Sequence, residues 1–185
     1  MPGHKQPTLR HLVLVLGDQL DAQSSALDGF DPAQDAIWMA EVAEESTHVP
    51  SSKQRIAVFL SAMRHFAEEI RQRGWRIHYR RLEDPENQGS LFAELRQSME
   101  KLKPQSVVMC PPGEWRVWQG IQAVVASLDV PLEVRDDRHF YTTVRDFKAH
   151  AQGRKQLRLE YFYRELRQRH QVLMDGKQPV GGQWN

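Results

Sequence analysis

The sequence has almost no cysteine. Cys110 is the single cysteine among 185 residues, which excludes a disulfide within the chain and any metal or iron–sulfur site built from four of its own cysteines. A chain of this kind is typical of a reducing compartment, so we expect a cytoplasmic protein. Cys110 itself ends an apolar stretch and is expected to be a small, buried hydrophobic residue.

Long apolar runs and an excess of one charge are also missing. The longest apolar run is far shorter than the roughly 18 residues of a membrane-spanning helix, so we expect no membrane partner. The first residues, MPGHKQPTLRH, lack the apolar stretch of a signal peptide. The net charge is +1 and the pI is about 8.0, so the composition carries no general signature of polyanion binding. Apolar residues make up 40% of the chain, which is enough for one ordinary domain with a tail.

Short apolar segments alternate with amphipathic ones. We expect strands at 12–16, 36–40, 75–81, 106–110 and 132–135, and helices at 51–74, 90–103 and 116–128. The segment SSALDGFDP, between the first two strands, is expected to be a loop. The alternation predicts an α/β fold: a Rossmann-like, doubly wound parallel sheet of five strands in the order 3-2-1-4-5, with a helical C-terminal tail.

Several residues mark the ends of the expected helices. Ser51 or Ser52 can cap the first helix, and Gly74 can end it in a left-handed conformation. Ser90 is the candidate cap of the second helix. Gly120 lies inside the third helix, where it costs roughly 1 kcal/mol relative to alanine.

The chain changes character after Asp136. The segments TTVRDFKAHAQ and RKQLRLEYFYRELRQRHQVL are expected to be helical, and the second is basic and aromatic. We therefore divide the chain into an α/β domain at 9–138 and a helical linker at 139–185.

Two interpretations of the basic helix remain open. Nucleic-acid bases can stack on Tyr161, Phe162 and Tyr163 while neighbouring arginines bind phosphates. Alternatively, apolar residues pack on a neighbour while the arginines reach water. Glu160 and Glu165 lie among the arginines and favour the second interpretation.

Polar residues follow the ends of three expected strands. These loops are Gly17–Leu20, Glu41–Ser46 and Pro111–Trp115. The carboxyl ends of parallel strands meet at one edge of a sheet, where open α/β sheets bind their ligands. We therefore expect one pocket, lined by Asp18, Gln19, Glu45, Gly113 and Glu114.

The lining of this pocket limits its ligands. Neither G-x-G-x-x-G nor G-x-x-x-x-G-K-S/T occurs in the chain, and several carboxylates would repel a phosphate. Carboxylates and amides suit a neutral ligand with hydroxyl and N–H donors, or a divalent cation. Alternative roles are turn capping for Asp18 and first-turn helix stabilisation for Glu44. No nucleophile–base arrangement is visible, so we assign no catalytic residue and no metal ligand.

The motifs LVLVLGDQL, AEVAEESTHVPSSKQRIAVFLSAMRHFA, PPGEWR, GRKQLRLEYFYRE and LMDGKQPVGGQWN occur in this order. They resemble successive motifs of the bacterial photolyase-related proteins, the iron–sulfur branch of the cryptochrome/photolyase family. The resemblance extends over nearly the whole chain from Leu9. It implies an α/β domain that binds an antenna chromophore, typically a dimethyl-ribityl-lumazine, and is not catalytic by itself.

The resemblance also implies a larger helical domain that holds FAD and a 4Fe–4S cluster. Characterised members repair (6-4) photoproducts in DNA, as lyases, or serve blue-light sensing. GGQWN resembles the start of a longer motif, so we expect the N-terminal part of a longer protein. The implied partners are its own C-terminal FAD domain and damaged DNA. Leu157, Tyr161, Phe162 and Leu166 are then expected to be exposed, or covered by a second copy in a dimer.

The resemblance assigns the antenna pocket to eight residues: Leu16, Asp18, Gln19, Leu20, Glu45, His48, Gly113 and Glu114. Many relatives have an aromatic residue such as tyrosine where this chain has His48. Two other functions remain as alternatives: a free-standing nucleotide-binding α/β domain, and an interaction module that uses the basic helical tail.

Overall fold

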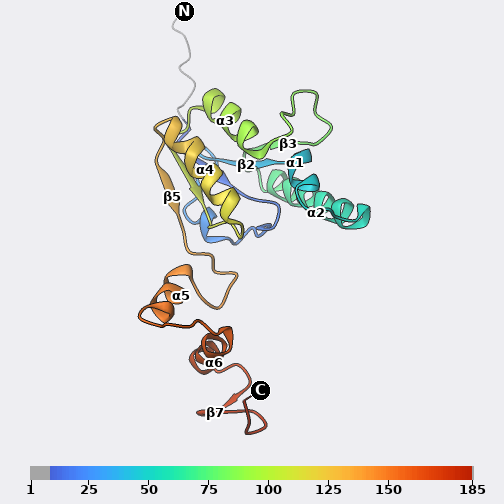
Figure 1. Ribbon diagram of the computed structural model, residues 1–185. Helices are drawn as coiled ribbons and strands as arrows, with labels where there is room; N and C mark the ends of the chain where they lie inside the picture. Colours follow the sequence, from blue (N-terminus) through green and yellow to red (C-terminus); the bar gives the residue numbers. More distant parts are fainter. Residues whose placement is uncertain (1–8, 185) are drawn as a thin grey trace, which may run out of the picture. The chain divides into compact units, whose positions relative to one another are not determined.

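The structure is a computed structural model that describes residues 9–184 (Figure 1). The chain divides into two compact units, and the boundary in the sequence lies between Arg135 and Asp136. We expected this boundary between residues 138 and 139.

The first unit contains the predicted sheet. Its strands are β1 (His11–Leu14), β2 (Ala36–Ala40), β3 (Ile77–Arg80), β4 (Ser106–Met109) and β5 (Leu132–Val134). All neighbouring pairs are parallel and the order is β3-β2-β1-β4-β5, which confirms the predicted fold class. In the register of the sheet, Val13 of β1 lies between Ile37 and Val108. Strand β1 ends at Leu14 rather than at Leu16, because the chain leaves the ladder after Val15 donates to the carbonyl of Trp38.

Four α-helices and one short 3₁₀ helix accompany the sheet. They are α1 (Ala43–Thr47), α2 (Lys53–Gln72), α3 (Leu91–Leu102), α4 (Trp115–Ser127) and η1 (Ser25–Leu27). Helix η1 stands in the connection between β1 and β2, which was expected to be a loop. Helix α1 lies in the second of the three polar strand-end segments, which was also expected to be a loop.

The two faces of the sheet carry different helices. Leu12 and Leu14 point to the face covered by α3 and α4, which lie side by side (Figure 1). Val13 and Val15 point to the opposite face, which is covered by α2 and η1. Because both faces are covered, the central strands read as continuous apolar runs instead of alternating ones.

The helix ends follow the sequence signals only in part. The hydroxyl of Ser52 accepts the N–H of Arg55 at 3.2 Å, so Ser52 is the cap of α2. Gly74 has a φ of +73°, as expected for a left-handed helix end. Ser90 precedes α3, but its side chain makes no capping hydrogen bond.

The second unit is built from two helices and a small hairpin. Helix α5 (Val144–Ala151) begins with a capping box between Thr143 and Asp146. Helix α6 (Leu159–His170) is shorter than expected, because Gln171 turns left-handed after it. The antiparallel strands β6 (Met174–Asp175) and β7 (Gln178–Pro179) follow where the sequence predicted only helix or linker.

The expected exposure of the apolar residues in and before α6 is wrong for Phe162 and only partly right for Leu166. Leu157 and Tyr161 are exposed, but Phe162 is only 5% exposed and packs against the rings of Phe147 and His150. Leu166 is half-buried. The hydrophobic face of α6 is thus partly covered by α5 within the same chain.

The arginines of α6 are largely committed to acidic side chains. Arg164 pairs with Glu160, and Arg169 pairs with Glu165 and with Asp146 of α5. Together with the packing of Phe162 on α5, these pairs favour the second interpretation, in which apolar residues pack on a neighbour and the arginines do not bind phosphates.

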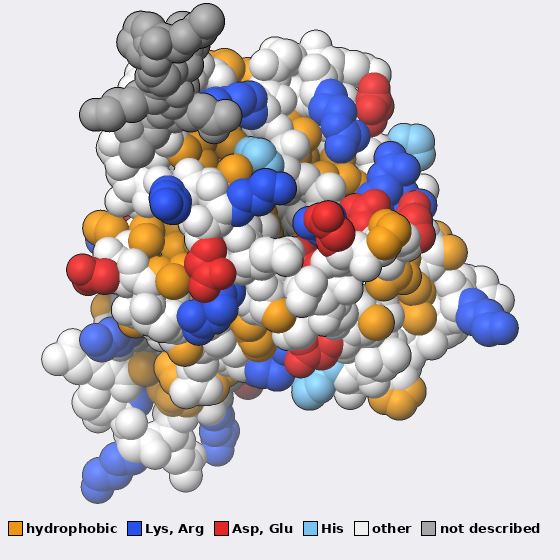
Figure 2. Space-filling view, turned by 90° about the horizontal axis from the view of Figure 1, so that it is seen from above, with side chains coloured by type: hydrophobic (Ala, Val, Ile, Leu, Met, Phe, Trp, Pro, Cys, Tyr) orange, Lys and Arg blue, Asp and Glu red, His pale blue; other side chains and the backbone are white. Residues whose placement is uncertain are grey.

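Charge is also mixed elsewhere. The face shown in Figure 2 carries basic, acidic and apolar side chains that are interspersed. Within residues 9–184, no helix combines the length and the apolar character that crossing a membrane requires.

Candidate functional site

A cavity of about 270 Å³ opens at the carboxyl ends of β1, β2 and β4. Its lining comes from the turn after β1, from β2 and α1, from the first half of α2, and from the start of α4. This is the edge of the sheet at which the chain reverses its winding direction, and where open α/β sheets place ligands.

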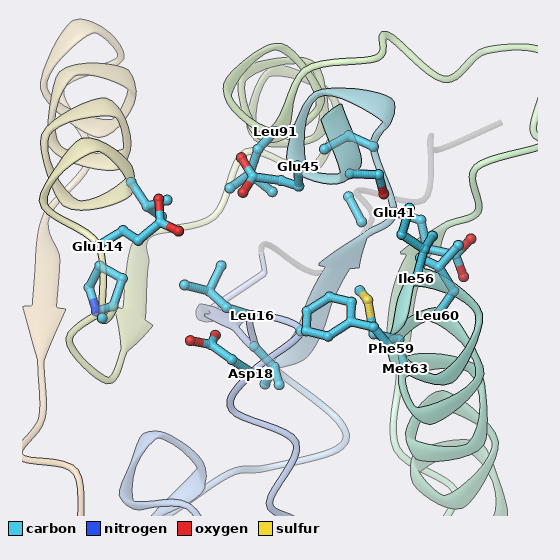
Figure 3. A pocket seen from close by; sticks show the side chains of 18 of the residues that line it. Leu16, Asp18, Glu41, Glu45, Ile56, Phe59, Leu60, Met63, Leu91 and Glu114 are labelled. Atoms are coloured by element: carbon cyan, nitrogen blue, oxygen red, sulfur yellow. The ribbon is translucent and has the colours of Figure 1, made fainter. Parts of the chain in front are cut away.

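Five of the eight residues that the family resemblance assigned to the pocket line this cavity. They are Leu16, Asp18, Glu45, Gly113 and Glu114. Figure 3 shows Leu16 and Asp18 in the middle of the site, with Glu114 on one side and the helix α2 on the other.

The other three assigned residues lie outside the lining. Gln19 donates from its side-chain amide to the carbonyl of Pro111 at 2.9 Å, which ties the turn after β1 to the turn after β4. Leu20 packs on the hydrophobic cluster between the sheet and α2. His48 ends α1 and is exposed.

Asp18 is an uncommitted acceptor at the pocket. The turn that follows β1 is closed by the backbone, through the N–H of Gln19 and the carbonyl of Leu16 at 2.9 Å. Within the described part of the chain, the carboxylate of Asp18 has no hydrogen bond or ion pair. Its side chain is therefore not needed to cap the turn, and it is free to accept a donor from a ligand.

Glu45 and Glu114 are linked by an arginine that the sequence reasoning did not select. Nη2 of Arg116 lies 2.8 and 2.9 Å from the two carboxylate oxygens of Glu45, and 3.2 Å from Oε2 of Glu114. Burial alone would lower the pKa of Arg116, but the hydrogen bonds that it donates to the two carboxylates raise the pKa above its ordinary value. Arg116 is in the quoted motif PPGEWR, yet its partner Glu45 is distant in sequence, so no local pattern revealed the pair.

Glu41 is a fourth acid that lines the pocket, but its oxygens are already occupied. It accepts two hydrogen bonds from Arg64, at 2.8 and 2.7 Å, and one from the N–H of Leu82 at 2.9 Å. The hydroxyl of Tyr79 also donates to it. Burial by itself would raise the pKa of Glu41, but these donors outweigh burial and hold the pKa below its ordinary value. Glu41 therefore anchors α2 to β2 and is not a free ligand group.

An apolar wall faces the acids across the pocket. Ile56, Phe59, Leu60 and Met63 of α2 contribute it, with the spacing of one helix face. Their spacing in the sequence predicts a helix but does not indicate a pocket wall, and Phe59 remains 43% exposed. The direction in which α2 runs along the sheet is what indicates its place at the pocket. In a strand–helix–strand unit the helix runs back along the sheet, so the first turns of α2 lie at the carboxyl edge of the strands.

The turn after β1 approaches this wall closely. A Cβ atom on Gly17 would lie 2.5 Å from two ring atoms of Phe59 and 2.9 Å from the sulfur of Met63. A Cβ atom on Gly113 would instead lie 3.8 Å from Oδ2 of Asp18, which is an ordinary contact. Close packing therefore requires glycine at position 17 and leaves room at position 113.

The pocket suits a ligand that is flat and partly apolar, with several hydrogen-bond donors. The wall of α2 offers apolar contact, and Asp18 and Glu114 offer acceptors. Ser46, Ser51 and Arg55 add polar groups to the lining. Over residues 9–184, no three His, Cys, Asp or Glu side chains group together as metal ligands would, so the divalent-cation alternative finds no ligand set there.

Comparison with known proteins adds two findings. The family described as "Deoxyribodipyrimidine photo-lyase-related protein" matches residues 13–185. A protein of Agrobacterium fabrum named "(6-4) photolyase" is 44% identical over 177 residues, which make up 96% of this chain and 35% of that relative. The chain thus spans about a third of the length of the relative.

Proposed function

The chain belongs to the deoxyribodipyrimidine photo-lyase-related protein family, and on that premise we propose that its first unit binds an antenna chromophore of the ribityl-lumazine type. The parent protein would be a cytoplasmic, light-dependent DNA-repair lyase of the (6-4) type, or a blue-light sensor. In this proposal FAD and a 4Fe–4S cluster belong to a helical domain outside these 185 residues. Damaged DNA and that domain are the partners.

One observation carries the proposal: the pocket joins an apolar wall to an uncommitted carboxylate. A lumazine has a flat ring, which suits the wall that contains Phe59 and Met63. Its ribityl chain carries several hydroxyl donors, which suit the free acceptor of Asp18 and the second acceptor of Glu114. A charge-assisted hydrogen bond of this kind contributes about 1.5–3 kcal/mol.

The size of the pocket is compatible with such a ligand. The cavity of about 270 Å³ is just below the range of about 300–1,000 Å³ that is typical of small-molecule sites. It can enclose the ring while the end of the ribityl chain extends toward solvent. The bound antenna would absorb light and pass its excitation through space, so the residues of this unit bind and orient it and need no catalytic role.

Titration of the chain with 6,7-dimethyl-8-ribityllumazine, followed by fluorescence, tests the proposal. We expect saturable binding to the wild type and about tenfold weaker binding to Asp18→Asn, because the ligand donor loses a charged acceptor. Asp129→Asn is the matched control. It makes the same change at an exposed residue of the same unit that lies outside the pocket, and it should bind like the wild type.

Two results would count against the proposal. The first is a folded wild type that does not bind lumazine. The second is an Asp18→Asn variant with unchanged affinity, which would remove Asp18 from the site. ATP serves as a competitor in the same titration. Displacement of lumazine by ATP would favour the nucleotide-binding alternative, which the missing phosphate-binding glycines make unfavourable.

A further inference from the structure

Arg116 connects two elements that both contribute to the pocket lining, α1 and α4. Through Nη2 alone it reaches both carboxylate oxygens of Glu45 on α1 and one oxygen of Glu114, the residue that precedes α4. Both acids line the pocket. Their side chains are partly exposed. The bridge that Arg116 forms between Glu45 and Glu114 therefore lies where the pocket meets solvent.

Helix α1 has few other attachments. It contains five residues, none of which is buried, and its hydrophobic anchor is Val42, the buried residue that precedes it. The hydroxyl of Thr47 bonds within the helix, and the backbone N–H of Glu44 bonds the carbonyl of Gly89 at 3.1 Å. The ion pair with Arg116 is therefore a main determinant of where Glu45 stands.

The bridge is not arranged for maximum stability. Nε and Nη1 of Arg116 are buried, and neither has a hydrogen-bond partner in the described part of the chain. Oε2 of Glu44 is also buried and has no hydrogen-bond partner among the described residues. Unpaired buried donors are costly. Buried polar groups are normally paired when they stabilise a fold. The unpaired donors of Arg116 beside a pocket therefore indicate a role in ligand binding rather than in stability.

We infer that Arg116 is a positioning residue for the pocket. Its guanidinium fixes Glu45 and Glu114 in place and balances part of their charge. It also holds α1 at the edge of the pocket, where this helix retains the ligand. Without it, two neighbouring carboxylates would face the pocket with no cation between them, and α1 would lose its tie to α4. The identity of the ligand rests on the function proposed above, whereas the effect on α1 does not.

The first test uses the full chain without ligand. Hydrogen–deuterium exchange of the amides in residues 43–48 is compared between the wild type, Arg116→Gln and Arg71→Gln. Arg71 pairs with Glu68 on α2, so Arg71→Gln removes the same charge far from the bridge. We expect exchange about two- to fivefold faster in Arg116→Gln only. Adding Glu45→Gln to Arg116→Gln should give little further increase, because the two residues act as one pair.

The second test measures lumazine affinity and dissociation. Arg116→Gln should weaken binding about tenfold, mainly through faster dissociation. Arg116→Lys keeps the positive charge but lacks the planar guanidinium group, so it should recover part of the lost lumazine affinity. Arg71→Gln should match the wild type.

The outcomes separate the two proposals. Unchanged exchange in residues 43–48 of Arg116→Gln overturns the inference, whether or not lumazine binds. Faster exchange with unchanged lumazine affinity also overturns it, since α1 would then be irrelevant to the pocket. Faster exchange in a chain whose wild type binds no lumazine leaves Arg116 as the residue that positions α1, while the proposed ligand fails.

Discussion

Two glycines of the pocket, Gly17 and Gly113, differ in what a side chain would meet. At Gly17 an added methyl group would clash with the ring of Phe59, whereas at Gly113 it would make an ordinary contact with Asp18. Gly17→Ala should therefore push Phe59 aside, at a cost of about 1–3 kcal/mol in the free energy of unfolding. Lumazine affinity should fall with it, because Phe59 belongs to the pocket wall.

Gly113→Ala is the matched comparison. It should leave the free energy of unfolding within about 0.5 kcal/mol of the wild type and lower affinity only if the ligand approaches the backbone there. Urea unfolding and lumazine titration of both variants measure the difference. A Gly17→Ala variant as stable as the wild type would show that Phe59 moves freely.

The lowered pKa of Glu41 predicts that the free energy of unfolding depends on pH. Its folded pKa lies below its ordinary value, so its contribution is present above the unfolded pKa of about 4.3 and is lost as the pH falls through the folded pKa. Unfolding in urea should therefore become easier between about pH 5 and pH 3. Glu41→Gln should be less stable at pH 7 by roughly 1–3 kcal/mol, because Arg64 and Tyr79 lose a charged partner.

Other carboxylates also titrate in this range, so the informative quantity is the difference between the wild type and Glu41→Gln. That difference should shrink as the pH falls. A constant difference from pH 7 to pH 3 would mean that the pKa of Glu41 is the same in the folded and the unfolded chain.

At the scale of elements, contact between α3 and α4 depends on Gly120. A Cβ atom there would lie 2.2 Å from ring atoms of Phe92 on α3. This explains why a glycine interrupts a helix, where it costs about 1 kcal/mol relative to alanine. We expect Gly120→Ala to lower the free energy of unfolding by about 1–3 kcal/mol, because the clash outweighs the gain in helix propensity.

The smaller side chain in Phe92→Leu should restore most of this loss when it is combined with Gly120→Ala. Thermal unfolding of the two single variants and the double variant measures the coupling. A more stable Gly120→Ala variant would show that α3 and α4 can separate without cost.

The elements also show which features a sequence can reveal. The sheet order followed from alternating segments and the handedness of crossovers, since both are local or general rules. Asp18, Glu45, Gly113 and Glu114 could be placed near one another because each follows a strand of that sheet. The α2 wall and the pair of Arg116 with Glu45 could not, because they depend on how helices far apart in sequence come together. The hairpin of β6 and β7 is too short to carry a periodic signal.

At the scale of the whole molecule, the pocket belongs to one unit. Every residue that lines it lies between Val15 and Val117, and the sheet ends with β5 at Val134. Of the buried apolar residues in the described part of the chain, only Phe162 and Pro179 belong to the second unit. The first unit thus holds both the core that stabilises the fold and the groups that would bind the ligand.

We therefore expect a chain that ends at Arg135 to fold and to bind lumazine as the full chain does. Independent folding follows from its own hydrophobic core. The segment 136–185, made alone, should lack a cooperative unfolding transition, because it buries little besides Phe162, His150 and Pro179. Circular dichroism on heating and lumazine titration of both pieces test this. If the longer piece folds but does not bind while the full chain does, the second unit contributes to the site. If it does not fold, the two compact units are not independent in stability, and the boundary at Arg135 is only geometric.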